Sequence, residues 1–395
     1  MTTNKSYSKE ELADEGEKSG IEQEDDPIET NEPFDPASIS LTSKIVALDT
    51  VLRRIKNDTI RLAPDFQRNH VWDIARKSLL IESMMLRIPL PMFYVSEDSD
   101  GIWEVVDGLQ RLTTIKDFIL GEDNDGKGFK LKSLEFWGEK LNDMDFYSIE
   151  NKSTMPRIIN NIMEAELSFT IINPDTPEKV KRNIFKRINT GGMRLSMQEI
   201  RHALYQGPAT KLLLKLVQCD AYKKVIGETI KDNRMGGREL ILRYISFHLR
   251  GWTSYKGDMD SFLSDTMRYI NGELKLETKS EYSESKITED FSKALVRSQL
   301  LFGEHAFRRS RAGSHRKTPI NKSLFEIWTY IFSRASKESF EIIKNNKTHF
   351  LSDYYSLLDD DEDFIDSIGR HGGDNIGVKN RYTKIIQLVK EHIND

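Results

Sequence analysis

The chain of 395 residues contains a single cysteine, Cys219, so no disulfide can form within it. This scarcity is typical of proteins from a reducing compartment. No apolar run approaches the roughly 18 residues that a membrane-spanning helix needs, and the acidic N-terminus lacks the apolar segment of a signal peptide. We therefore expect a cytoplasmic protein that does not engage a membrane.

Two further absences limit the chemistry. The P-loop pattern G-x-x-x-x-G-K-[ST], which cradles nucleotide phosphates, does not occur. The eight histidines are scattered along the chain, and we find no pair at the spacing of metal ligands. Nucleotide hydrolysis would therefore need another architecture, and a histidine-rich nuclease module is not expected.

The net charge of −5 conceals an uneven distribution of charge. Residues 1–37 hold 12 acidic residues and 3 lysines, whereas the remainder holds 55 basic and 51 acidic residues, a net charge of +4. Because apolar residues are few in it, we expect residues 1–38 to form a disordered acidic leader. The leader is either a solvated tail or a nucleic-acid mimic that shields a basic groove.

Residues 102–121 combine a short apolar run with a helical pattern. The run Ile-Trp-Glu-Val-Val predicts a buried strand, and the next two residues, Asp107 and Gly108, form a turn dipeptide. Apolar residues then recur at helical spacing. The stretch therefore predicts a strand, a tight turn and a helix, with Asp107, Gln110 and Arg111 at the junction.

This junction has the chemistry of a phosphate site. The N-terminus of a helix attracts anions because its first N–H groups are unpaired, and Gly108 lets the backbone approach a ligand closely. Arg111 adds a planar, permanently charged fork, and Asp107 could hold a metal ion or orient a water molecule. The alternative is an ordinary corner in which Asp107 caps the helix.

A second polar stretch, PDFQRNHVW, spans residues 64–72. Its aromatic residues would hold the loop in place while Gln67 and Arg68 face a ligand. The alternative is an arginine paired with a neighbouring carboxylate.

A third stretch, residues 176–207, predicts two helices joined by a glycine-containing loop. Asn189 and Thr190 lie where the first helix ends, and Ser196 with Glu199 forms a capping box for the second. Backbone N–H groups in such a loop could hold phosphate. An ordinary helix–loop–helix with a Schellman-like stop is the alternative.

The order and spacing of PDFQRNHVW, a helix, IPLPMFYV and VVDGLQRLTTI resemble the N-terminal domain of GmrSD-type restriction endonucleases. That family has a ParB/sulfiredoxin-like fold and a DGQQR motif. Residues 107–111 read DGLQR, so Leu109 replaces the first glutamine, and the family's FQR element is present at residues 66–68. The segments RINTGG and EIR also match. The chain resembles a stand-alone member with a helical extension and no HNH nuclease module.

The resemblance implies binding and hydrolysis of a nucleoside triphosphate (NTP) in a restriction or phage-defence system that acts on DNA. Asp107, Gln110 and Arg111 would be catalytic, with Asp107 also binding Mg²⁺. The nucleotide-binding residues would be Gln67, Arg68, Gly108, Thr113, Arg187, Asn189, Thr190, Glu199 and Arg201. The expected partners are an NTP, DNA and a separate nuclease subunit. A metal-dependent nuclease at the same site and a non-catalytic DNA-binding or regulatory module remain alternatives.

The fold class expected from these patterns is α+β. A ParB/sulfiredoxin-like nucleotide-binding domain would span residues 39–207, and a mostly α-helical domain would span residues 208–395, where strand patterns are scarce. The expected helices of this second part are 208–219, 238–250, 259–270, 288–307, 321–334 and 380–393.

One basic stretch lies within the helical part. Residues 305–325 contain no acidic residue, which predicts a patch that binds nucleic-acid phosphates. Its members are Arg308, Arg309, Arg311, Arg316 and Lys317. A solvated basic loop is the alternative.

Overall fold

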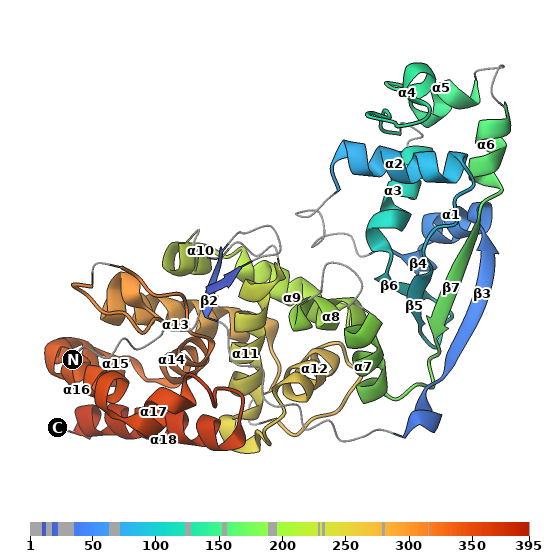
Figure 1. The fold of residues 1–395 in the computed structure, drawn as a ribbon. Coiled ribbons are helices and arrows are strands. Elements are labelled where there is room, and N and C mark those ends of the chain that lie inside the picture. Colours follow the sequence, from blue (N-terminus) through green and yellow to red (C-terminus); the bar gives the residue numbers. More distant parts are fainter. Residues whose placement is uncertain are drawn as a thin grey trace, which may run out of the picture. The chain divides into compact units, whose positions relative to one another are not determined.

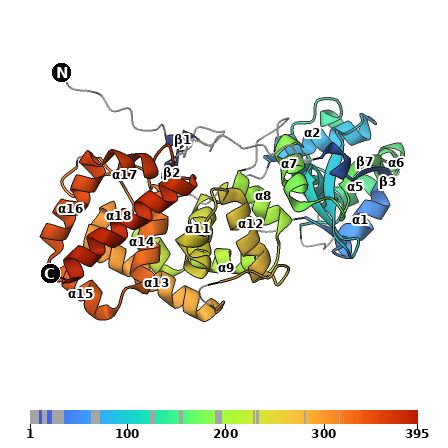
Figure 2. The same cartoon turned by 90° about the horizontal axis from the view of Figure 1, so that it is seen from below.

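The computed structural model of the chain describes residues 10–12, 18–22, 35–62, 72–122, 128–151, 156–188, 196–227, 230, 234–278, 281–314 and 316–394. The chain forms two compact units (Figures 1 and 2). Glu32–Leu195 is called the sheet unit below, and Ser196–Asp395 together with Met1–Asn31 is called the helical unit. The predicted fold class, an α+β part followed by a mostly helical part, is confirmed.

The sheet unit is built on a mixed sheet of five strands in the order β3-β7-β5-β6-β4. The strands are β3 Leu41–Ala47, β4 Ile60–Arg61, β5 Phe93–Glu97, β6 Trp103–Asp107 and β7 Glu166–Ile172. β5 pairs antiparallel with β6 and parallel with β7, while β3 pairs antiparallel with β7 and β4 parallel with β6. β6 is thus an interior strand, and its carboxyl end leads directly into a helix.

Helices complete the hydrophobic core of the sheet unit, in which Phe93, Phe118 and Phe169 are fully buried. They are α1 Leu48–Lys56, α2 Ile74–Met85, α3 Leu109–Ile119, α4 Gly138–Leu141, α5 Phe146–Glu150, α6 Pro156–Met163 and α7 Glu178–Ile188, and a 3-10 turn, η1, covers Pro36–Ser38. Asp73 is the N-cap of α2 and accepts a hydrogen bond from the backbone N–H of Arg76 at 2.7 Å. The buried Glu82 of α2 accepts three backbone N–H bonds from residues 135–137, so it fixes a loop to the core.

The helical unit surrounds α11, whose residues are buried on nearly all sides. Its helices are α8 Met197–Leu204, α9 Pro208–Val217, α10 Asp220–Ile226, α11 Gly236–Arg250, α12 Met259–Ile270, α13 Glu284–Phe302, α14 Lys322–Arg334, α15 Lys337–Asn345, α16 Lys347–Asp360, α17 Glu362–Ser367 and α18 Asn375–Asn394, with 3-10 turns η6 Trp252–Ser254 and η7 Gly303–His305. None of the helices that the structure describes is both long and apolar enough to cross a membrane.

A buried ion network holds three of these helices together. Glu326 of α14 is completely buried, and its two carboxylate oxygens accept from Arg381 Nε of α18 at 2.9 Å and from Arg243 Nη1 of α11 at 3.3 Å. Removing one member of such a network leaves an unpaired buried charge, which is strongly destabilising. The arginines of this region therefore stabilise the helical unit.

The structure differs from the predicted organisation at the boundary between the units. The expected boundary followed residue 207, whereas the helical unit begins at Ser196. The reason is that α8 packs against α11, a helix of the second part.

The structure also differs from the prediction of a disordered leader. β1 Glu10–Leu12 and β2 Lys18–Glu22 form an antiparallel pair within the helical unit. Ile21 is 2% exposed and joins the core, and Glu22 bonds to Asn321. One apolar side chain and one paired carboxylate thus hold part of this acidic segment, which the average composition did not reveal.

Candidate functional site

The junction of β6 and α3 has the predicted order of strand, turn and helix (Figure 1). Gly108 is the N-cap of α3 with a φ of 93°, a left-handed conformation that strains other residues. A Cβ atom at this position would lie 2.3 Å from Cδ1 of Phe93. Glycine is therefore required both by the backbone conformation and by the packing of the underlying ring.

The start of α3 has no side-chain cap. The alternative in which Asp107 caps the helix is thus wrong, since the carboxylate of Asp107 instead accepts from Arg111 Nη2 through Oδ2 at 2.8 Å. The side chain of Asp107 remains 41% exposed. The corner therefore presents an accessible carboxylate next to a helix N-terminus. The first N–H groups of this helix make no hydrogen bond to a capping side chain.

Arg111 is more enclosed than the sequence suggested, because its side chain is only 13% exposed. Besides the pair with Asp107, its guanidinium donates to the carbonyl oxygens of Pro91 and Met92 and lies with Cζ 4.6 Å from the centroid of the Phe93 ring. Burial lowers the pKa of Arg111, and the charge of Asp107 opposes that effect. Arg111 thus joins the start of α3 to the segment that enters β5 and also brings a positive charge to the corner.

The remaining predicted residues of the sheet unit have different outcomes. Gln110 and Thr113 are partly buried on α3, and Arg187 is exposed on the last turn of α7. Gln67, Arg68, Asn189 and Thr190 lie outside the described residues.

Glu199 and Arg201 lie in the interior of the helical unit. The predicted capping box is present, and Glu199 also pairs with Arg234 at 3.1 Å. Burial raises the pKa of Glu199, whereas the charge of Arg234 acts in the opposite direction. Arg201 is 2% exposed and pairs with Asp260 at 2.6 Å. Both side chains are occupied by contacts that stabilise the fold.

The basic stretch of residues 305–325 is largely neutralised by contacts within the helical unit. Arg308 is buried and donates to the carbonyl of Thr318. Three other members pair with carboxylates: Arg309 with Glu22 at 3.2 Å, Arg311 with Asp359 at 2.7 Å and Lys317 with Glu304 at 2.6 Å. A linear count of basic residues overlooked these acids because they lie far away in sequence or just outside the stretch.

One cluster of potential metal ligands was not predicted. His349, Asp353 and His392 bring their ligand atoms within 4.8 Å of one another, although the histidines showed no pair at metal-ligand spacing. The His-x-x-x-Asp spacing of residues 349–353 was the available signal, because residues four apart share a helix face. Asp107 belongs to no comparable group of three ligands among the described residues.

Comparison with curated proteins and with solved structures gave no match. Residues 48–206, which contain β6, α3 and the DGLQR corner, match the family model described as the N-terminal domain of the GmrSD restriction endonuclease. The match extends across α8, so it ends slightly beyond the sheet unit. This part of the chain is thus similar to the N-terminal domain of the GmrSD restriction endonuclease.

Proposed function

We propose that residues 48–206 bind and hydrolyse an NTP at the β6–α3 corner, as part of a restriction or phage-defence system that acts on DNA. The supporting observation is the corner itself. In a domain similar to that of the GmrSD endonuclease, α3 starts at Gly108 without a side-chain cap, between the accessible carboxylate of Asp107 and the guanidinium of Arg111. A helix N-terminus with an adjacent arginine is suited to phosphate.

In this proposal, the first N–H groups of α3 and Arg111 hold phosphate oxygens, and Gln110 orients the attacking water. Asp107 contributes one carboxylate to Mg²⁺. One carboxylate is sufficient, since Mg²⁺ at nucleotide sites is held by one or two carboxylates together with phosphates and water. The ion pair through Oδ2 places Asp107 and Arg111 in contact before the nucleotide arrives.

The two alternatives have less support from the described residues. A metal-dependent nuclease at Asp107 would need further ligands, and no group of three includes this carboxylate. A DNA-binding module built on the basic stretch would need cations without competing partners, whereas Arg308 is buried and Arg309, Arg311 and Lys317 have acidic partners. DNA recognition is therefore assigned to the system rather than to this stretch.

The test is calorimetric titration of the full chain with each common NTP in the presence of Mg²⁺. Arg111→Ala should weaken binding roughly 10- to 100-fold, because a charge-assisted contact contributes about 1.5–3 kcal/mol. Asp107→Asn should reduce turnover of NTP more than binding. Absence of NTP binding by the unaltered chain, with and without DNA, would overturn the proposal.

A control is needed because Arg111 also stabilises the fold. Arg54 of α1 has similar structural contacts, with Cζ 3.8 Å from the ring centroid of Trp103 and a bond of 2.8 Å to the carbonyl of Gly101. Trp103 and Asp107 are the opposite ends of β6. Arg54→Ala should therefore lower thermal stability while NTP affinity is kept. An equal loss of affinity in both variants would show that Arg111 acts only through the fold.

A further inference from the structure

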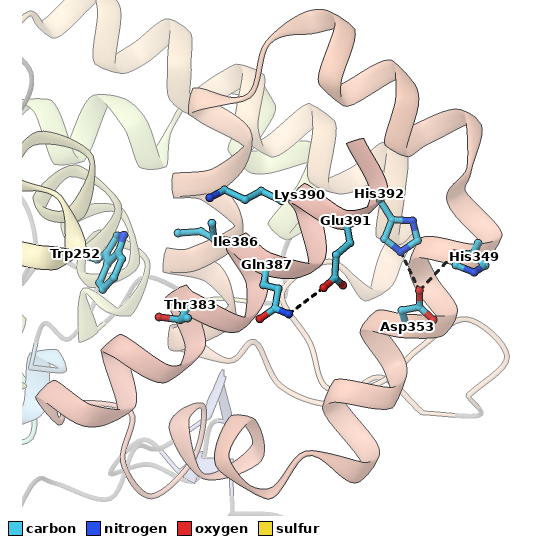
Figure 3. A pocket seen from close by; sticks show the side chains of 9 residues that line it. All are labelled: Trp252, His349, Asp353, Thr383, Ile386, Gln387, Lys390, Glu391 and His392. Carbon is cyan, nitrogen blue, oxygen red and sulfur yellow. Dashed lines mark hydrogen bonds and ion pairs between the residues drawn. The ribbon is translucent and has the colours of Figure 1, made fainter. Parts of the chain in front are cut away.

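Two imidazoles and one carboxylate converge on a surface of the helical unit (Figure 3). Oδ2 of Asp353 lies 2.9 Å from Nε2 of His392 and 3.4 Å from Nδ1 of His349. The figure shows both rings directed toward this carboxylate, one from α18 and one from α16. These are the ligand types that divalent transition metals such as Zn²⁺ prefer.

The fold itself brings the three side chains together. His349 and Asp353 are four residues apart on α16, so they lie on the same helix face. α18 packs against α16 and supplies His392. His392 is 3% exposed at its side chain, whereas the side chains of His349 and Asp353 are 64% and 45% exposed. One ligand is thus fixed by packing and two remain accessible from solvent.

We propose that His349, Asp353 and His392 form a binding site for a divalent transition metal ion of the Zn²⁺ class. Zn²⁺ binds imidazole nitrogen and carboxylate oxygen at about 2.0–2.2 Å, which puts tetrahedral ligand atoms roughly 3.4 Å apart. The three ligand atoms here already lie within 4.8 Å of one another. Small side-chain adjustments are enough to complete the coordination, and the backbone need not move.

The arrangement has features of an open metal site. Three protein ligands leave a fourth tetrahedral position for water or another ligand, as in catalytic rather than structural zinc sites. The three residues line a surface pocket of about 800 Å³, which also includes Trp252, Lys390 and Glu391. The fourth position can therefore be occupied by a water molecule or by a small ligand in this pocket.

The buried ring of His392 also has unused bonding capacity. Its Nε2 faces Asp353, but its Nδ1 is buried without a hydrogen-bond partner in the described part of the chain. In most metal sites the second ring nitrogen of a histidine ligand bonds to a neighbouring group, so Nδ1 of His392 is the atom at which this site has no such support among the described residues. The single engaged nitrogen is the one that points at the other two ligands.

The proposal is tested by titrating the full chain, free of any affinity tag, with Zn²⁺ in a calorimeter and with Co²⁺ in a spectrophotometer. One equivalent of Zn²⁺ should bind, and Co²⁺ should give the visible absorption of a tetrahedral or five-coordinate site. His349→Ala should weaken Zn²⁺ binding at least tenfold, since even loss of a residue that only orients a ligand costs 10- to 100-fold. His349 is exposed, so this variant should fold normally.

A matched control is available in the same unit. His371 Nδ1 lies 2.7 Å from Asp374 Oδ2, and the side chains are 56% and 45% exposed, but no third ligand among the described residues joins this pair. His371→Ala should leave Zn²⁺ binding unchanged, whereas Asp353→Asn and His392→Gln should weaken it. Absence of saturable binding, or an equal loss in the His349 and His371 variants, would overturn the proposal. NTP binding should be normal in His349→Ala, so this test is independent of the nucleotide proposal.

Discussion

The attachment of the acidic leader to the helical unit depends on Ile21. This side chain is 2% exposed within the helical core, and a Cβ on Gly236 would come 2.6 Å from its Cδ1 atom, which shows how closely it packs against α11. The neighbouring backbone forms two bonds, from Glu22 N to Ile320 O at 2.8 Å and from Ile320 N to Gly20 O at 2.9 Å. Ile21→Ala should therefore release the leader.

The expected magnitude follows from the contacts. Burial of an isoleucine contributes about 1.5–3 kcal/mol, the bonds of Glu22 to Asn321 and Arg309 about 1.5–3 kcal/mol, and each backbone bond about 0.5–1.5 kcal/mol. Ordering the five residues of β2 opposes this by about 1–2 kcal/mol each. Because the terms nearly cancel, docking is marginal. A loss of about 2 kcal/mol should shift the docking equilibrium roughly 30-fold without unfolding the helices.

Hydrogen exchange measures this effect locally. In Ile21→Ala, the amide of Ile320 loses its acceptor on Gly20, so peptides that contain residue 320 should exchange faster while the melting temperature changes little. Ile376 of α18 is 74% exposed, so Ile376→Ala is the control that should leave exchange at Ile320 unchanged. Unchanged exchange in Ile21→Ala would refute the docking argument.

Three further predictions concern stability. Glu82→Gln should lower the stability of the sheet unit by about 1–3 kcal/mol in thermal melts, because the new amide NH₂ cannot accept hydrogen bonds that the backbone N–H groups of residues 135–137 donate. Glu139→Gln, at an exposed position, is the control. Gly108→Ala should lower the free energy of unfolding by about 1–3 kcal/mol because of the φ of 93° at this position, and the clash with Phe93 should lower it further. A melting temperature equal to that of the unaltered chain would contradict this. Burial, assisted by Arg334, lowers the pKa of His248 from 6.5 to about 4. As the pH falls, the unfolded chain therefore binds this proton first, so the free energy of unfolding should decrease from about pH 6.5 to pH 4, by up to about 3 kcal/mol. Urea unfolding at several pH values should show a smaller decrease for His248→Gln.

The elements around the corner could be predicted because local signals agreed there. The strand and helix on either side of Asp107 follow from a change of hydrophobic period. The same signal fails at β3, where Ile45 and Val46 lie at helical spacing with the apolar residues of α1 but belong to the strand. Ile45 is 68% exposed on that strand, so an apolar residue at helical spacing did not indicate burial.

The partners of the charged residues could not be predicted, because they depend on contacts between distant parts of the chain. The sequence shows Arg309 as one of several clustered cations, but its partner Glu22 lies in the leader. In the same way, no helix was expected over residues 335–379, where α15, α16 and α17 lie. Because α16 was not predicted, nothing in the sequence placed His349 and Asp353 near His392. Pairing across the fold, rather than local pattern, thus decides which polar residues are available to a ligand.

The DGLQR sequence also gains a physical explanation from the fold. Leu109, which replaces the first glutamine of the family motif, is 7% exposed and packs in the core of the sheet unit. A glutamine in the same environment would bury an amide that needs hydrogen-bond partners, at a cost of about 1–3 kcal/mol if they are missing. In this chain the position therefore anchors α3 rather than facing a ligand. The polar side chains at the corner are therefore those of Asp107, Gln110 and Arg111. Of the two charged groups, the carboxylate of Asp107 is more accessible than the enclosed guanidinium of Arg111.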